Sequence, residues 1–166
     1  MAAPILILCL GNEILSDDGF GPEVARHLLE LPLDPDRVEV LFAPIAGFAL
    51  IQLMNDRRSV LVVDSIQSGR EPGTMRMFEA GEFTPSRNLT TSHQISLPTA
   101  LELGRRLGCS MPQRVDVLAV EAQDVETLHE GMTVCVAGAV EPALEKIQLW
   151  LSIQLQEEKY VGKIAG

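Results

Sequence analysis

Long hydrophobic runs and an excess of basic charge are both missing from this 166-residue sequence. Its apolar stretches fall well short of the roughly 20 residues that a membrane-spanning helix needs. The chain holds 13 Lys and Arg against 23 Asp and Glu, which gives a formal net charge of -10. Because a surface of this sign repels phosphate groups, nucleic acid and anionic membranes are not expected as partners.

Cysteine is scarce, and the three cysteines lie far apart in the sequence: Cys9, Cys109 and Cys135. They form no CxxC pair and are odd in number, so we expect small core or boundary side chains in a reducing cytoplasm rather than a disulfide framework. The first residues lack the basic segment of a signal peptide. The length favours one domain, predicted over residues 1–158, with a flexible C-terminal tail over 159–166.

Several motifs of known chemistry are also absent. The sequence has no GxGxxG or GxxxxGK[ST] segment, so a nucleotide-binding α/β module is only a distant alternative. It has no GxSxG segment and no HExxH segment, which excludes an esterase-type serine site and a zincin site.

The sequence does contain a regular alternation of strand-like and helix-like segments. Continuous apolar runs predict buried strands, and amphipathic stripes predict helices. The predicted strands are 4–10, 37–43, 59–65 and 114–122, with 73–83 as an antiparallel edge strand. The predicted helices are 17–31, 47–56, 96–108 and a long one from about Thr133 that is kinked or restarted near Pro142. This order predicts a single-domain, three-layer α/β fold, with a mostly parallel twisted sheet and helices on both faces.

Polar residues stand where the predicted strands end. The first strand runs into a glycine-rich turn, after which Asp17 and Asp18 open the first helix. The strand 59–65 carries Asp64 at its end, and His93 follows a polar loop over 84–93. Because the carboxyl ends of parallel strands share one edge of the sheet, these side chains are expected on the same rim. Two carboxylates and one imidazole without thiolate suit a borderline divalent metal such as nickel or zinc.

Each of these residues also has a purely structural alternative. Ser16, Asp17 or Asp18 could cap the first helix, and we expect Ser16 or Asp17 to do so. Asp64 could cap the following turn, and His93 could simply be solvated. The other two histidines, His27 and His129, lie in less favourable positions for a site.

Three stretches resemble the maturation endopeptidases of [NiFe] hydrogenases. "LGNEILSDDGFGPEV" is similar to the opening segment of that family, "LVVDSI" to its strand ending in Asp, and "TTSHQISL" to its Thr/Ser-x-His segment. A fainter match, "EGMT", precedes the C-terminal helix. Together the matches extend in the same order from residue 6 to about residue 150.

The resemblance implies an endopeptidase that removes the C-terminal peptide of a nickel-loaded hydrogenase large-subunit precursor by metal-assisted hydrolysis. It assigns the catalytic metal ligands to Asp18, Asp64 and His93. The nickel would come with the substrate protein, so the free protein is expected to bind metal only weakly, although zinc or cadmium could occupy the site in vitro. The alternative is a non-catalytic factor that docks on the precursor and checks its nickel.

Two departures from the family pattern stand out. Some members carry Glu where this chain has Asp18. The segment "FAPIAGF", residues 42–48, stands where many members have Asp-Gly-Gly-Thr-x-Gly, and only Gly47 remains of that pattern. This implies a different substrate-docking loop.

Overall fold

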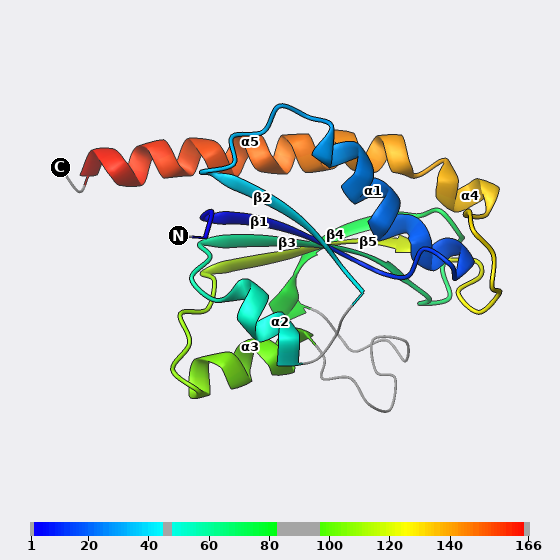
Figure 1. Ribbon diagram of the computed structural model, residues 1–166, viewed down its shortest axis with the longest axis horizontal. Helices are drawn as coiled ribbons and strands as arrows, with labels where there is room; N and C mark the ends of the chain where they lie inside the picture. The colour runs from blue at the N-terminus through cyan, green and yellow to red at the C-terminus, as the bar shows by residue number, and fades with distance from the viewer. Residues whose placement is uncertain (1, 45–47, 83–96, 165–166) are drawn as a thin grey trace.

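A five-stranded sheet organises the chain in the computed structural model, which describes residues 2–44, 48–82 and 97–164. The strand order is β2-β1-β3-β5-β4 (Figure 1). The strands are β1 (Ile5–Leu10), β2 (Val38–Ala43), β3 (Ser59–Ile66), β4 (Met75–Glu79) and β5 (Arg114–Glu121). β1, β2, β3 and β5 run parallel, and β4 pairs antiparallel with β5 at the edge. The predicted mostly parallel sheet with an antiparallel edge strand is confirmed.

Helices cover both faces of this sheet, as the sequence predicts. They are η1 (Ser16–Gly19), α1 (Phe20–Leu29), α2 (Phe48–Met54), η2 (Ala80–Glu82), α3 (Leu97–Arg106), α4 (Val134–Ala137) and α5 (Val140–Ile164). Figure 1 shows α1 and α5 on one face and α2 and α3 on the other. None of the helices in the described part of the chain is long and apolar enough to cross a membrane.

Two predicted helices are divided. The first consists of the 3-10 turn η1 followed by α1, and the last restarts between α4 and α5. Pro142 lies in the first turn of α5, where backbone N–H groups have no partner inside the helix, so the proline fits there at little cost. The helix α5 continues through residues 159–164, and their predicted flexibility stays a prediction.

The core consists of two apolar layers, one on each face of the sheet. In β1, Ile5, Ile7 and Cys9 pack toward α1 and α5, whereas Leu6 and Leu8 pack toward α2 and α3. Burial on both faces explains why the central strands are continuously apolar. The predicted stripe of the C-terminal helical region is buried in the first layer: Val136, Val140, Leu144, Ile147 and Leu151.

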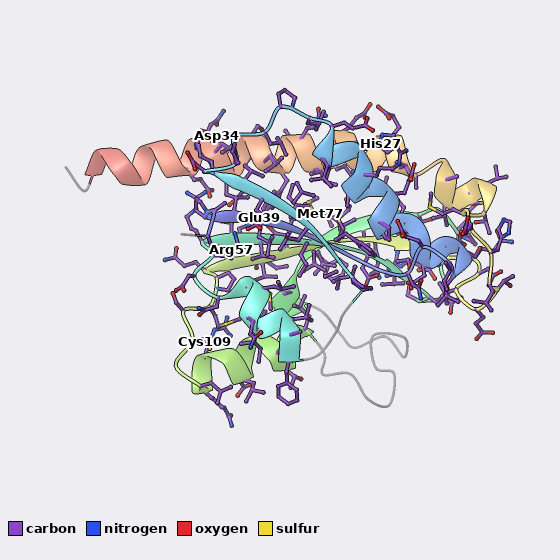
Figure 2. The ribbon with its side chains drawn as sticks, viewed as in Figure 1. His27, Asp34, Glu39, Arg57, Met77 and Cys109 are labelled. Carbon is purple, nitrogen blue, oxygen red and sulfur yellow. The ribbon has the colours of Figure 1, made fainter. Side chains whose placement is uncertain are left out.

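The side chain of Arg57 connects the amino ends of the parallel strands through a hydrogen bond and an ion pair. Arg57 is buried just before β3 and donates from Nη1 to the carbonyl oxygen of Ala3 at 2.7 Å. Its Nη2 forms an ion pair with Glu39 of β2 at 2.5 Å, and Figure 2 shows the two side chains next to each other at this end of the sheet. The carboxyl ends of the parallel strands lie at the opposite edge, which is where open α/β sheets bind ligands.

The connections place a topological switch point at that opposite edge. From β1 the chain crosses one face through α1 to reach β2, and from β2 it crosses the other face through α2 to reach β3. The chain therefore leaves β1 and β3 in opposite directions at a topological switch point, where open α/β sheets bind ligands.

Glycines let the first turn pack closely against the end of β1. A Cβ atom on Gly21 would lie 2.0 Å from the carbonyl oxygen of Leu10, and a Cβ on Gly11 would lie 2.1 Å from that of Asp18. Gly11 also has a φ of 137°, which L side chains rarely adopt. These glycines therefore serve close backbone packing, with Asp18 held against the turn.

This packing predicts that Gly21→Ala destabilises the protein. Alanine is favoured over glycine in a helix by up to about 1 kcal/mol, but the overlap with backbone should reverse that sign and cost about 2 kcal/mol. The matched control is Gly81→Ala in η2, where a Cβ atom would meet nothing within 4 Å. The free energy of unfolding in urea gives the comparison, and equal stability of the two variants would contradict the prediction.

Candidate active site

Asp18 and Asp64 are brought together at the switch point, and Ser65 connects them. Asp18 lies in η1 after β1, and Asp64 lies near the end of β3. The Ser65 hydroxyl donates to Oδ1 of Asp18 at 3.1 Å, and the Ser65 backbone N–H donates to Oδ1 of Asp64 at 2.8 Å. Two of the three predicted ligands therefore share one site in space, and their role as ligands stays a prediction.

Burial makes the charge of these two carboxylates costly. Loss of hydration, followed by the nearby charge of Asp18, raises the pKa of Asp64 from 3.8 to about 7, although the Ser65 N–H opposes this. Burial also raises the pKa of Asp18, against hydrogen bonds from Ser65 and from the backbone of Asn12 that lower it. A cation between the two carboxylates would offset both the lost hydration and their repulsion. Carboxylate oxygens in such a setting fit a divalent metal.

The third predicted ligand, His93, lies outside the described residues, as does the rest of the 84–93 loop. Residues 45–47 of the unusual 42–48 segment are also outside them. Among the described residues, no group of three or more His, Cys, Asp or Glu side chains could hold a metal ion. The described part of the candidate site is thus a pair of aspartates.

Asp17 does not cap a helix, and the capping prediction is wrong. No side-chain hydrogen bond caps η1 or α1, both of which are described in full. Asp17 is instead completely buried and accepts hydrogen bonds from the backbone N–H groups of Gln123, Asp124 and Thr133 and from the Thr133 hydroxyl, at 2.7–3.0 Å. The adjacent aspartates therefore differ in role: Asp17 anchors the segment after β5, and Asp18 meets β3.

A third buried carboxylate at this rim, Glu121, was not anticipated from the sequence. It ends β5 and accepts hydrogen bonds from the backbone N–H groups of Ser68, Gly69 and Arg70 and from the Ser68 hydroxyl. Ser65 was missed as well, because it looks like an ordinary polar residue at a strand end. No local sequence pattern indicates that its hydroxyl reaches a residue 47 positions earlier in the chain.

The two other histidines and the three cysteines were weaker candidates, and of these Cys9 lies near Asp64. His27 pairs with Glu23 on the surface of α1 at 3.2 Å, and His129 bonds through its backbone to Ile14 and Ser16. Burial raises the pKa of the Cys9 thiol to about 12, which makes it a poor nucleophile. Cys135 is exposed, so the prediction that all three cysteines are core or boundary residues is wrong for this one.

Known proteins share this fold and sequence pattern. The family described as hydrogenase maturation protease matches residues 22–150. The hydrogenase 2 maturation protease of Escherichia coli is 33% identical over 146 residues, covering 86% of this chain and 87% of that protein. A putative hydrogenase maturation protease of Methanocaldococcus jannaschii is 32% identical over 150 residues, covering 86% and 93%. The solved structure of the hydrogenase maturating endopeptidase HybD from E. coli has a TM-score of 0.78 at 30% identity, covering 93% and 94%.

The fold and these similarities together define the class of protein: a single-domain α/β endopeptidase, and hence a hydrolase. More specifically, the chain belongs to the hydrogenase maturation protease family. The resemblance inferred from the three sequence stretches is confirmed, and the family implies a hydrogenase as the substrate.

The contacts of Asp17 predict a large loss of stability in Asp17→Asn. The new amide group would turn an N–H donor toward backbone donors, leaving buried groups unpaired at about 1–3 kcal/mol each. This exceeds the roughly 1 kcal/mol of a helix cap. Urea unfolding should show it, with Asp124→Asn as control, since that half-buried side chain accepts bonds from the nearby backbone of Glu126 and Thr127. A cost similar to that of the control would contradict the anchoring role.

The raised pKa of Asp64 predicts that the metal-free protein loses stability as the pH rises. The folded state holds this proton more tightly than the unfolded chain does, so the penalty is absent below about pH 4, grows with pH, and is complete above about pH 7. Relative to Asp64→Asn, wild type should lose a few kcal/mol of unfolding free energy across this range. Urea unfolding of both proteins at several pH values measures the difference. Parallel pH profiles would argue against a buried titrating Asp64.

Proposed function

We propose that this protein removes the C-terminal peptide of a nickel-loaded [NiFe] hydrogenase large-subunit precursor. The observation that carries the proposal is the Asp18–Asp64 pair at the switch point, in which one carboxylate is buried beside a second without a basic side chain as partner among the hydrogen bonds and ion pairs of the described residues. A cation delivered by the substrate would complete such a site. Family membership supports the reaction class.

The residues of the chain serve to bind and orient the cation that arrives with the substrate. Asp18 and Asp64 offer carboxylate oxygens, and His93 is proposed as the third ligand. Nickel in the precursor would polarise the scissile carbonyl group or activate a water molecule. Asp64 can exchange a proton near neutral pH, since its pKa is about 7. It can therefore lose that proton as the cation-bearing precursor docks.

The partner is a protein, and the reaction is proposed to occur in the cytoplasm. The net charge of -10 disfavours nucleic acid and anionic membranes as partners. The 42–48 segment, which departs from the family pattern, is proposed to contact the precursor, so its sequence would select a subgroup of hydrogenases.

The metal-ligand proposal predicts that Asp18→Asn, Asp64→Asn and His93→Ala each abolish cleavage of nickel-loaded precursor while the fold is kept. Each change removes one of three ligands, and such losses reduce activity far more than stability. Mass measurement of the precursor gives the readout, and circular dichroism monitors folding.

The control variant is Asp116→Asn, because Asp116 is a buried carboxylate that bonds to Trp150 and Arg114, outside the proposed ligand set. It should retain cleavage if folded. Wild-type cleavage by the His93 variant would remove His93 from the site. A wild-type protein that binds the precursor but leaves it intact would support the non-catalytic docking factor instead.

A further inference from the structure

We infer that Ser65 is a positioning residue that holds the carboxylates of Asp18 and Asp64 in the arrangement that receives the cation. This rests on the proposed function, since it concerns the same two aspartates. Among the described residues, Ser65 bonds to both: its hydroxyl donates to Asp18 and its backbone N–H donates to Asp64.

Each of the two hydrogen bonds from Ser65 occupies one of the two oxygens of a carboxylate. Both are made to Oδ1, at 3.1 Å for Asp18 and 2.8 Å for Asp64. Ser65 therefore leaves Oδ2 of each carboxylate to another partner and fixes the plane in which that oxygen lies. Outer hydrogen bonds of this kind orient metal ligands and raise their affinity.

The position of Ser65 in the sheet makes it a rigid support. It lies inside β3, where it pairs with Val120 of β5. Successive side chains of a strand point to opposite faces. Asp64 shares the parity of Val60 and Val62, which pack toward α2 and α3, whereas Ser65 is on the face of Leu61 and Val63. The serine hydroxyl thus reaches η1 on one face while its backbone holds Asp64, so one strand position fixes both carboxylates.

The hydroxyl also opposes the repulsion between the two aspartates. Before the substrate arrives, the repulsion between the two charges favours rotation of the less firmly held carboxylate away from its neighbour. Asp18 belongs to a short 3-10 turn, whereas Asp64 belongs to a central strand. Asp18 is therefore the carboxylate that needs to be held, and it is the one that receives the hydroxyl.

Cadmium titration of the free protein tests the positioning role without the hydrogenase. The amide shifts of 15N-labelled protein report the Cd²⁺ dissociation constant (Kd), which is expected to be weak for wild type. Ser65→Ala should raise this Kd about tenfold. Because Ser65 lies in a strand, the isosteric pair Ser65→Thr and Ser65→Val provides a second comparison. Thr keeps the hydroxyl and should bind Cd²⁺ within about threefold of wild type, whereas Val should match Ala.

The chain offers a matched control at Ser68. Its hydroxyl donates to the buried Glu121 at 2.6 Å, which is the same kind of bond on a carboxylate outside the candidate site. Ser68→Ala should lower the melting temperature and leave the Cd²⁺ Kd unchanged. A purely structural role of Ser65 would make the two alanine variants alike in both measurements.

Cleavage kinetics on nickel-loaded precursor separate this inference from the proposed function. Because the cation is part of the substrate, Ser65→Ala should lower kcat/KM about tenfold, and Ser65→Thr should restore it. Wild-type Cd²⁺ affinity and kcat/KM in Ser65→Ala would overturn the inference while leaving the proposed function intact. The absence of saturable Cd²⁺ binding in wild type would also overturn it. If Cd²⁺ affinities follow the expected order but wild type cleaves no precursor, the positioning role stands and the proposed function fails.

Discussion

The charge of Asp64 at the end of a central strand is the interaction on which the rest of the site depends. A buried carboxylate needs hydrogen-bond donors or a cation, and without them its pKa rises. Among the described residues, Asp64 accepts one backbone N–H from its own neighbour and lies beside a second carboxylate, and burial and that charge raise its pKa to about 7. The strand cannot move away to relieve it, because β3 is hydrogen-bonded on both sides in the middle of the sheet. Under the proposed function, the cation that arrives with the substrate relieves this constraint.

Three other buried carboxylates show how the chain itself can supply hydrogen-bond donors to a buried charge. Asp17 and Glu121 each accept four hydrogen bonds and thereby fix the segments that follow β5 and β3. Asp116 receives the indole N–H of Trp150 at 2.6 Å and the Arg114 guanidinium at the same distance. These three carboxylates stabilise the frame, whereas Asp64 accepts a single hydrogen bond from the described residues. Asp64 marks the place for chemistry, because acids with a strongly perturbed pKa are candidates for function.

The sequence predicted most of the fold for a physical reason. Strands buried on both faces must be apolar throughout, so β1, β3 and β5 could be recognised locally. The restart near Pro142 follows equally from the missing N–H of proline. The roles of Asp17 and Ser65 could not be predicted, because their partners are remote. Asp17 bonds to residues 106 to 116 positions away, and the Ser65 hydroxyl bonds to one 47 positions away. A capping motif is local in sequence, so the sequence alone predicted a capping role for Asp17. His93 was assigned through the family resemblance and stays a prediction.

An unmet charge in the free protein has a consequence for specificity under the proposed function. A metal held permanently by the enzyme would neutralise the charge of Asp64 before any substrate arrived. The affinity for the precursor would then not depend on the nickel that the precursor carries. When the free enzyme holds no metal, a precursor that lacks nickel does nothing to reduce the repulsion between the two carboxylates. A nickel-loaded precursor brings a divalent positive charge that reduces it. Opposite charge within a few ångströms favours the ionised form of a carboxylate and so opposes the effect of burial. The enzyme would thus bind the loaded precursor more tightly than the precursor that lacks nickel. The unfavourable burial of the Asp64 charge at the end of β3 would therefore let the enzyme distinguish the nickel-loaded precursor from the precursor without nickel.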